Sequence, residues 1–97
     1  MNEPGEFHRF VIERDIPGAG TLSEDELANI ARKSCAVLDE LGASIRWIHS
    51  YVTDDRIYCI YSAANDGLIR RHAELGGFPA NRISRMSAII DPSTAAA

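Results

Sequence analysis

The segment from Ile45 to Ala63 constrains the fold of this chain more than any other part of the sequence. Residues 45–53 and 56–63 are rich in β-branched and aromatic side chains, which favour strands. Only Asp54 and Asp55 separate the two runs, and aspartate tolerates the backbone angles of a short turn. The pattern therefore predicts an antiparallel β-hairpin, and its register decides which polar side chains share a face.

Two registers are consistent with this turn. A two-residue loop, which we favour, pairs residue 49 with residue 60 and places these side chains on one face: Trp47, His49, Tyr51, Tyr58 and Ile60. The other face then carries Ile48, Ser50, Val52, Ile57, Cys59 and Tyr61. A three-residue loop, 54–56, with its extra residue in a bulge, would instead group His49, Tyr51, Cys59 and Tyr61.

The segments around the hairpin predict two more strands and two helices. Residues 7–14 alternate like a strand, which the Pro-Gly-Ala-Gly run 17–20 ends. A helix over 24–41 follows, with Ser23 as its N-cap and Glu26 completing a capping box. Asn65 or Asp66 caps a second, shorter helix, which ends at the glycines 76–77. The last strand lies within 82–90, and Asp91-Pro92 ends the regular structure.

The resulting order, βαββαβ, predicts an α+β, ferredoxin-like domain that spans residues 1–97, with 1–6 and 93–97 flexible. Two helices should cover one face of a four-stranded antiparallel sheet. The other face would then expose Trp47, Tyr51, Tyr58 and Ile60. Because so apolar a face is unfavourable in water, we expect a homodimer that packs sheet against sheet.

Composition argues against several classes of partner. The 97-residue chain has a formal charge of −4 and a pI near 5.2, with arginines spread along it, so nucleic-acid binding is not expected. No apolar run reaches membrane-spanning length and no basic-then-apolar leader is present, so we expect a cytoplasmic protein without a membrane span. Cys35 and Cys59 form no CxxC motif, and we expect both to be small, buried, reduced thiols.

Four stretches carry a resemblance to a known family: VIERDIPG, WIHSYVTDDRIYCIYSA, IRRHAELGGFPANRIS and the closing IIDP. Together they resemble a small bacterial domain family of unknown function, from about residue 10 to residue 92. The resemblance implies a ferredoxin-like fold that assembles as a dimeric α/β barrel. One member of that family is described as a nickel-binding protein, so the resemblance also implies Ni²⁺ as a ligand.

The histidines are the first candidates for a nickel site, because imidazole, carboxylate and thiolate groups suit this metal. His49 is a polar residue on an otherwise apolar strand, and it is either a ligand or a hydrogen-bonded histidine in the dimer interface. His72 follows Leu68 by four residues and so faces the sheet, where it is either a ligand or a satisfied core residue.

Glu13 and Cys59 complete the candidate metal set. Glu13 is an acid on a central strand that should border the strand holding Cys59. It could instead act as a general base or pair with Arg9, Arg14 or Arg85. In the two-residue register Cys59 faces the helix layer, as His72 does, whereas His49 lies on the opposite face. A compact site with both histidines therefore requires the other register or ligands from two subunits.

Two function classes follow. The first is a non-enzymatic Ni²⁺-binding protein for storage, sequestration or delivery of the metal. The second is a small enzyme or small-molecule carrier that uses a cavity between sheet and helices, with His49, Tyr51 and Tyr58 as orienting or acid-base groups. No nucleophile triad, phosphate loop or dinucleotide fingerprint is present, so the sequence leaves open whether any reaction is catalysed. A dimer with a purely structural role is the third alternative.

Overall fold

The computed structural model describes residues 6–96, and its elements follow the predicted order. The strands and helices are β1 (His8–Asp15), α1 (Glu24–Leu41), β2 (Ile45–Val52), β3 (Arg56–Ala63), α2 (Asp66–Gly76) and β4 (Arg82–Arg85). Short 3-10 helices, η1 (Ala19–Thr21) and η2 (Pro92–Ala96), lie after β1 and near the end of the chain. The prediction of an α+β domain with the order βαββαβ is confirmed.

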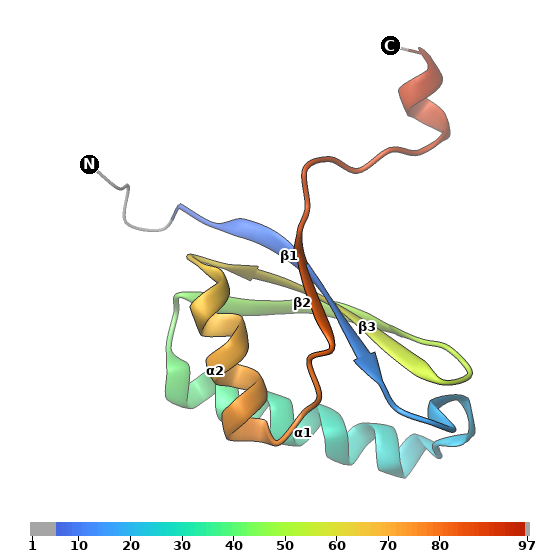
Figure 1. Ribbon diagram of the computed structural model, residues 1–97, viewed down its shortest axis with the longest axis vertical. Helices are drawn as coiled ribbons and strands as arrows, with labels where there is room; N and C mark the ends of the chain where they lie inside the picture. Colours follow the sequence, from blue (N-terminus) through green and yellow to red (C-terminus); the bar gives the residue numbers. More distant parts are fainter. Residues whose placement is uncertain (1–5, 97) are drawn as a thin grey trace.

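The four strands form one antiparallel sheet in the order β2-β3-β1-β4. Both helices lie against the same face of this sheet, as Figure 1 shows. We call the opposite side, which neither helix covers, the open face. The arrangement is the predicted ferredoxin-like one, and the dimer remains a prediction.

The hairpin has the two-residue register near its turn. Tyr51 pairs with Tyr58, Ser50 with Cys59 and His49 with Ile60, and Thr53 N donates to Arg56 O at 2.8 Å. His49 and Cys59 therefore lie on opposite faces, and the grouping expected from a three-residue loop is wrong.

A β-bulge at Ile48 corrects one part of the predicted pattern. Trp47 pairs with Tyr61 while His49 pairs with Ile60, so Ile48 is an extra residue in β2. Such an insertion moves every residue before it to the other face. The prediction that Trp47 lies with His49 on the open face was wrong: its ring stacks on Tyr61 in the helix-covered layer, at 6.5 Å between centroids.

The Asp54-Asp55 turn is fastened to the loop after β1. Gly18 N donates to the Asp55 carboxylate at 2.9 Å, and Gly20 N donates to Asp54 O at 3.0 Å. A Cβ on Gly20 would approach the Asp54 backbone to 3.0 Å, so only glycine allows this contact without displacement. Asp54 and Asp55 thus stabilise the turn through these hydrogen bonds.

The core lies between the sheet and the helices. Phe10 and Ile12 of β1 pack with Ile57 and Tyr61 of β3 and with Ile69 of α2, all 5% exposed or less. From α1, Leu38 and Leu41 pack against this cluster, as the predicted apolar stripe requires. This layer determines which side chains are removed from water.

The last strand is shorter than predicted. Met86 N still donates to Arg9 O at 2.8 Å, but β1 itself begins at His8, so the chain beyond Met86 has almost no strand left to pair with. Residues 87–96 leave the body of the domain, and η2 lies well away from the sheet (Figure 1). Of the ends expected to be flexible, 93–96 belong to η2, whereas 1–5 and 97 lie outside the described residues.

Within residues 6–96, no helix has the length and apolar character needed to cross a membrane.

The start of α1 provides a test of the capping box. Glu26 N donates to Ser23 Oγ at 3.1 Å and Ser23 N donates to Glu26 Oε1 at 2.9 Å. Ser23→Ala removes the cap acceptor, so the free energy of unfolding should fall by about 1 kcal/mol in urea melts. Ser87→Ala, at an exposed serine outside the helices and strands, is the control and should leave it unchanged. Equal stabilities of both variants and the unmodified protein would contradict the role of the cap.

Candidate functional site

The open face carries His49 at an exposed position on β2. Its Nε2 lies 3.0 Å from the hydroxyl of Tyr51, and the two rings meet edge to face with centroids 5.0 Å apart. Tyr51 is 57% exposed. An imidazole that is accessible and held in orientation by a hydroxyl is suited to binding a metal ion from solution.

Glu13 also lies on the open face, two strands away from β2. It is opposite Tyr58 of β3, which in turn is opposite Tyr51. Its carboxylate is 3.8 Å from Arg56 Nη1 and 3.9 Å from Arg82 Nε, so it takes part in two loose ion pairs. Glu13 therefore has the ion-pairing role that the sequence left open, although with other arginines than expected, and it does not contact His49.

His72 lies on the other side of the sheet, buried under the helices. Its Nε2 is 3.0 Å from Ser34 Oγ and 3.4 Å from the Tyr61 hydroxyl, and Ser34 Oγ is 3.1 Å from that hydroxyl. Burial, helped by the nearby charge of Arg14, lowers the pKa of His72 to about 4. Burial likewise raises the pKa of Tyr61. The cluster is neutral at physiological pH.

This cluster contains a serine beside a histidine, the two residue types that are the nucleophile and the base of a catalytic triad. The histidine Nδ1 is buried and has no hydrogen-bond partner among residues 6–96, however, so no third group of the described chain orients the ring as a catalytic base requires. A base with a pKa near 4 is also a weak proton acceptor at neutral pH. The geometry does not support acyl transfer by Ser34.

Cys59 and Arg14 lie side by side in the same buried layer. Arg14 Nε donates to Cys59 Sγ at 3.2 Å, and Arg14 Nη1 donates to Pro79 O at 2.6 Å. The guanidinium also lies over the Phe78 ring, 5.4 Å from its centroid. Cys59 thus accepts a hydrogen bond from a cation in this chain. Cys35 is exposed and far along α1, so the expectation of a buried thiol was wrong for Cys35 and holds for Cys59.

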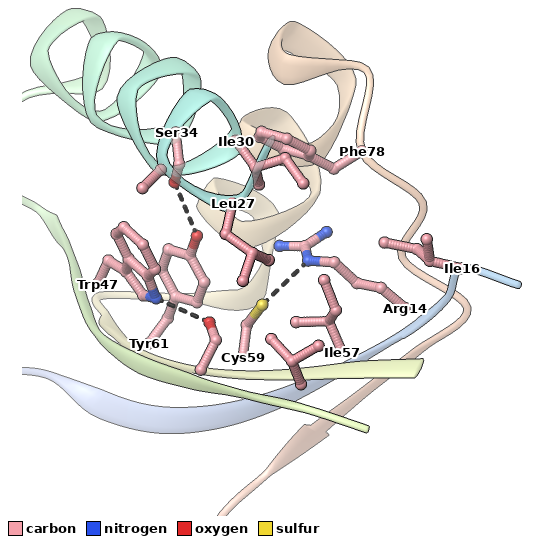
Figure 2. Close-up of a pocket in the computed structure, with 13 residues that line it drawn as sticks. Arg14, Ile16, Leu27, Ile30, Ser34, Trp47, Ile57, Cys59, Tyr61 and Phe78 are labelled. Atoms are coloured by element: carbon pink, nitrogen blue, oxygen red, sulfur yellow. Dashed lines mark hydrogen bonds between the residues drawn. The ribbon is translucent and has the colours of Figure 1, made fainter. Parts of the chain in front are cut away.

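A pocket of about 230 Å³ opens between the sheet and α1 (Figure 2). Its walls are mostly aliphatic and aromatic, and a few polar groups interrupt them. The lining residues are Arg14, Ile16, Leu27, Ile30, Ala31, Ser34, Trp47, Ser50, Val52, Ile57, Cys59, Tyr61 and Phe78. Along the wall that β2 forms, Trp47 Nε1 donates to Ser50 Oγ at 3.0 Å.

The four candidate ligands are therefore divided between the two faces. His49 and Glu13 lie on the open face, and His72 and Cys59 lie in the helix-covered layer, where each has a partner of its own. Among residues 6–96 no three histidine, cysteine, aspartate or glutamate side chains converge as a metal site would require. One copy of the chain does not bring the four together.

The sequence predicted a cavity between sheet and helices, but its assignment of His49, Tyr51 and Tyr58 to that cavity was wrong, because all three lie on the open face. Sequence reasoning missed Arg14, which lines the pocket. The signal was present in β1, where Phe10, Ile12 and Arg14 alternate on one face and the third is a cation at a core position. Trp47 was missed for a different reason, since the bulge that turns it inward has no clear mark in the sequence.

Comparisons with known proteins agree with this architecture. A family model described as "Nickel responsive protein SCO4226-like" matches residues 10–86. A search of curated proteins gave no match. Among solved structures, the crystal structure of SCO4226 from Streptomyces coelicolor A3(2) superposes with a TM-score of 0.71 at 18% identity, covering 84% of this chain and 99% of that one. At this identity the structural match supports the fold alone.

The burial of His72 makes stability depend on pH. Its pKa is about 4 in the folded protein against 6.5 for an exposed histidine, so below pH 6.5 the unfolded chain gains a proton that the native state does not. As far as His72 is concerned, the free energy of unfolding is highest above pH 6.5 and decreases as the pH falls towards 4. Urea melts should show this loss, and His72→Gln should remove that part of the slope.

The control for this experiment is His49→Gln, because His49 is exposed. It should retain the pH dependence of the unmodified protein between 6.5 and 4. If His72→Gln and the unmodified protein lose stability in parallel over this range, the buried neutral histidine is not responsible.

Proposed function

The chain belongs to the SCO4226-like family of nickel responsive proteins, and on this basis we propose that it binds Ni²⁺ on the open face through His49. The observation that carries the proposal is the exposed imidazole held by Tyr51 at 3.0 Å. The role would be non-enzymatic, in storage, sequestration or delivery of the metal, which is here cargo and not a catalytic cofactor.

The choice of His49 over His72 follows from accessibility. His72 is 1% exposed, its Nε2 contacts Ser34 and Tyr61, and metal binding there would require opening of the core. At His49, a Nε2–H group that donates to the Tyr51 oxygen leaves the lone pair of Nδ1 for a metal ion. Metal-binding histidines commonly donate their second nitrogen to such an orienting group.

A single imidazole does not complete the coordination of Ni²⁺, and the described residues of one copy offer no cluster that would. We propose that a second copy of the chain, packed through the same open face, supplies further ligands. In a two-fold dimer the same surface meets itself, so both copies bring His49 and Glu13 to one interface. Water molecules can fill the remaining positions.

The open face has the character of such an interface. Tyr58 and Ile60 of β3 and Val11 of β1 are half-buried there, next to the exposed Tyr51, and no helix of the described chain covers them. An apolar sheet face of this kind is stabilised when it is removed from water.

Calorimetric titration of the untagged protein with NiCl₂ tests the metal site. Tyr51→Phe removes the orienting hydroxyl and should weaken binding by about tenfold. His49→Ala removes the ligand and should abolish binding. The matched control is His8→Ala, because His8 lies on β1 beside Arg85, 2.8 Å from its Nη2, and should bind as the unmodified protein does. Binding no tighter than about 100 μM in the unmodified protein, or unchanged binding in His49→Ala, would refute the site.

Sedimentation equilibrium tests the dimer. Ile60→Arg places a charge in the centre of the open face, which should shift the protein from dimer to monomer because burial of an unpaired charge costs several kcal/mol. Leu75→Arg is the control, since Leu75 is 41% exposed on α2, on the helix side of the sheet. A monomer at micromolar concentration in the unmodified protein would contradict the dimer. Nickel binding of normal affinity by a monomeric Ile60→Arg variant would contradict the shared ligands.

A further inference from the structure

Arg14 is a charged residue in the place of a core residue. It follows Phe10 and Ile12 at alternate positions of β1, and its side chain is 3% exposed in the layer between the sheet and the helices. Removing a guanidinium from water is unfavourable unless a counter-charge and hydrogen bonds replace its hydration. The groups that contact the Arg14 guanidinium therefore determine whether its charge is compensated.

The partners of Arg14 found within residues 6–96 include no carboxylate. Arg14 donates to Cys59 Sγ and to Pro79 O and lies over the ring of Phe78, and no carboxylate of these residues lies within ion-pairing distance of it. The two hydrogen bonds use only part of the donor fork of a guanidinium. A buried positive charge thus remains without a carboxylate counter-ion in the described chain.

The Arg14 charge affects the pKa values of neighbouring side chains. The Arg14 guanidinium is, after burial, the second cause that lowers the pKa of His72, and it also acts on the pKa of Tyr61. Both groups stay neutral beside it, so neither supplies a negative charge. The layer has a positive potential that an anion could offset.

The same guanidinium reaches into the pocket beneath α1. Figure 2 shows it extending from β1 between Cys59 and the rim formed by Ile30 and Phe78. The hydroxyls of Tyr61 and Ser34 line the pocket as well, and the rest of the wall is mostly apolar. The pocket therefore combines an apolar body with one buried cation and a few hydrogen-bonding groups, as small-molecule sites do.

We propose that this pocket binds a small aromatic monocarboxylate, whose carboxylate pairs with Arg14 and whose ring lies against Trp47, Leu27 and Ile30. A carboxylate accepts two parallel hydrogen bonds from an arginine, which would provide the missing counter-charge. The volume of about 230 Å³ exceeds the cavity of about 150 Å³ that holds benzene, so it has room for one ring with a short acidic side chain. This site is separate from the metal site on the open face.

The single tryptophan of the chain reports on the pocket directly, because Trp47 lines it. The experiment titrates the untagged protein with 3-phenylpropionate and follows the fluorescence of Trp47. We expect a saturable change for this acid and binding weaker by about tenfold or more for 3-phenylpropanamide, the uncharged amide of the same shape. Equal affinities for the acid and the amide, or no saturable change up to millimolar acid, would overturn the proposal.

Two variants and one control test whether the acid binds in the pocket beside Arg14. Arg14→Gln should lose the preference for the acid, and Ala31→Phe, which fills the pocket from α1, should lose binding of both compounds. Arg56→Gln is the matched control, because Arg56 is an exposed arginine paired with Asp15 at 2.7 Å, and it should bind as the unmodified protein does. A folded Arg14→Gln variant that still prefers the acid would refute Arg14 as the anchor. Should that variant fail to fold, the comparison of acid with amide on the unmodified protein decides the question, and the outcome does not depend on nickel.

Discussion

The antiparallel pairing of β1 with β3 at the centre of the sheet is the constraint on which the rest of the structure depends. It joins His8–Asp15 to Arg56–Ala63 over eight residues and places Ile12 opposite Cys59 and Glu13 opposite Tyr58. Because side chains alternate along a strand, a slip of one residue would exchange the two faces of β1. Arg14 would then lie in solvent and Glu13 in the core.

This pairing produces two faces with different chemistry. The helix-covered layer holds a cation, a thiol, two hydroxyls and a neutral histidine among apolar side chains, and the sheet separates these from the open face. The open face holds an accessible imidazole, a carboxylate in loose ion pairs and an apolar centre. The two proposed sites, a small-ligand pocket and a nickel site at a dimer interface, therefore lie on opposite sides of the sheet.

Two buried polar groups of the helix-covered layer, Arg14 in the pocket and His72, are energetically costly to bury. Among residues 6–96 the Arg14 guanidinium has no carboxylate partner and His72 Nδ1 has no hydrogen-bond partner, and both raise the free energy of the folded state. Groups of this kind are expected at sites of function more often than in a core that serves stability alone. The apolar cluster around Ile12 and Ile69 stabilises the fold against them.

The sequence by itself determined the order of elements and the capped start of α1, and it favoured the two-residue turn that separates His49 from Cys59, because these depend on local propensities and alternation. Only the tertiary structure decided the inward turn of Trp47, the shortened β4 and the meeting of Arg14 with Cys59 and Phe78. These features depend on a bulge, on the length of the strand that pairs with β4, and on contacts between residues 45 or 64 positions apart. They arise from packing in three dimensions and leave no periodic signal in the sequence. The further ligands of the proposed nickel site belong to the same class, because they would depend on which surfaces two folded chains bring together.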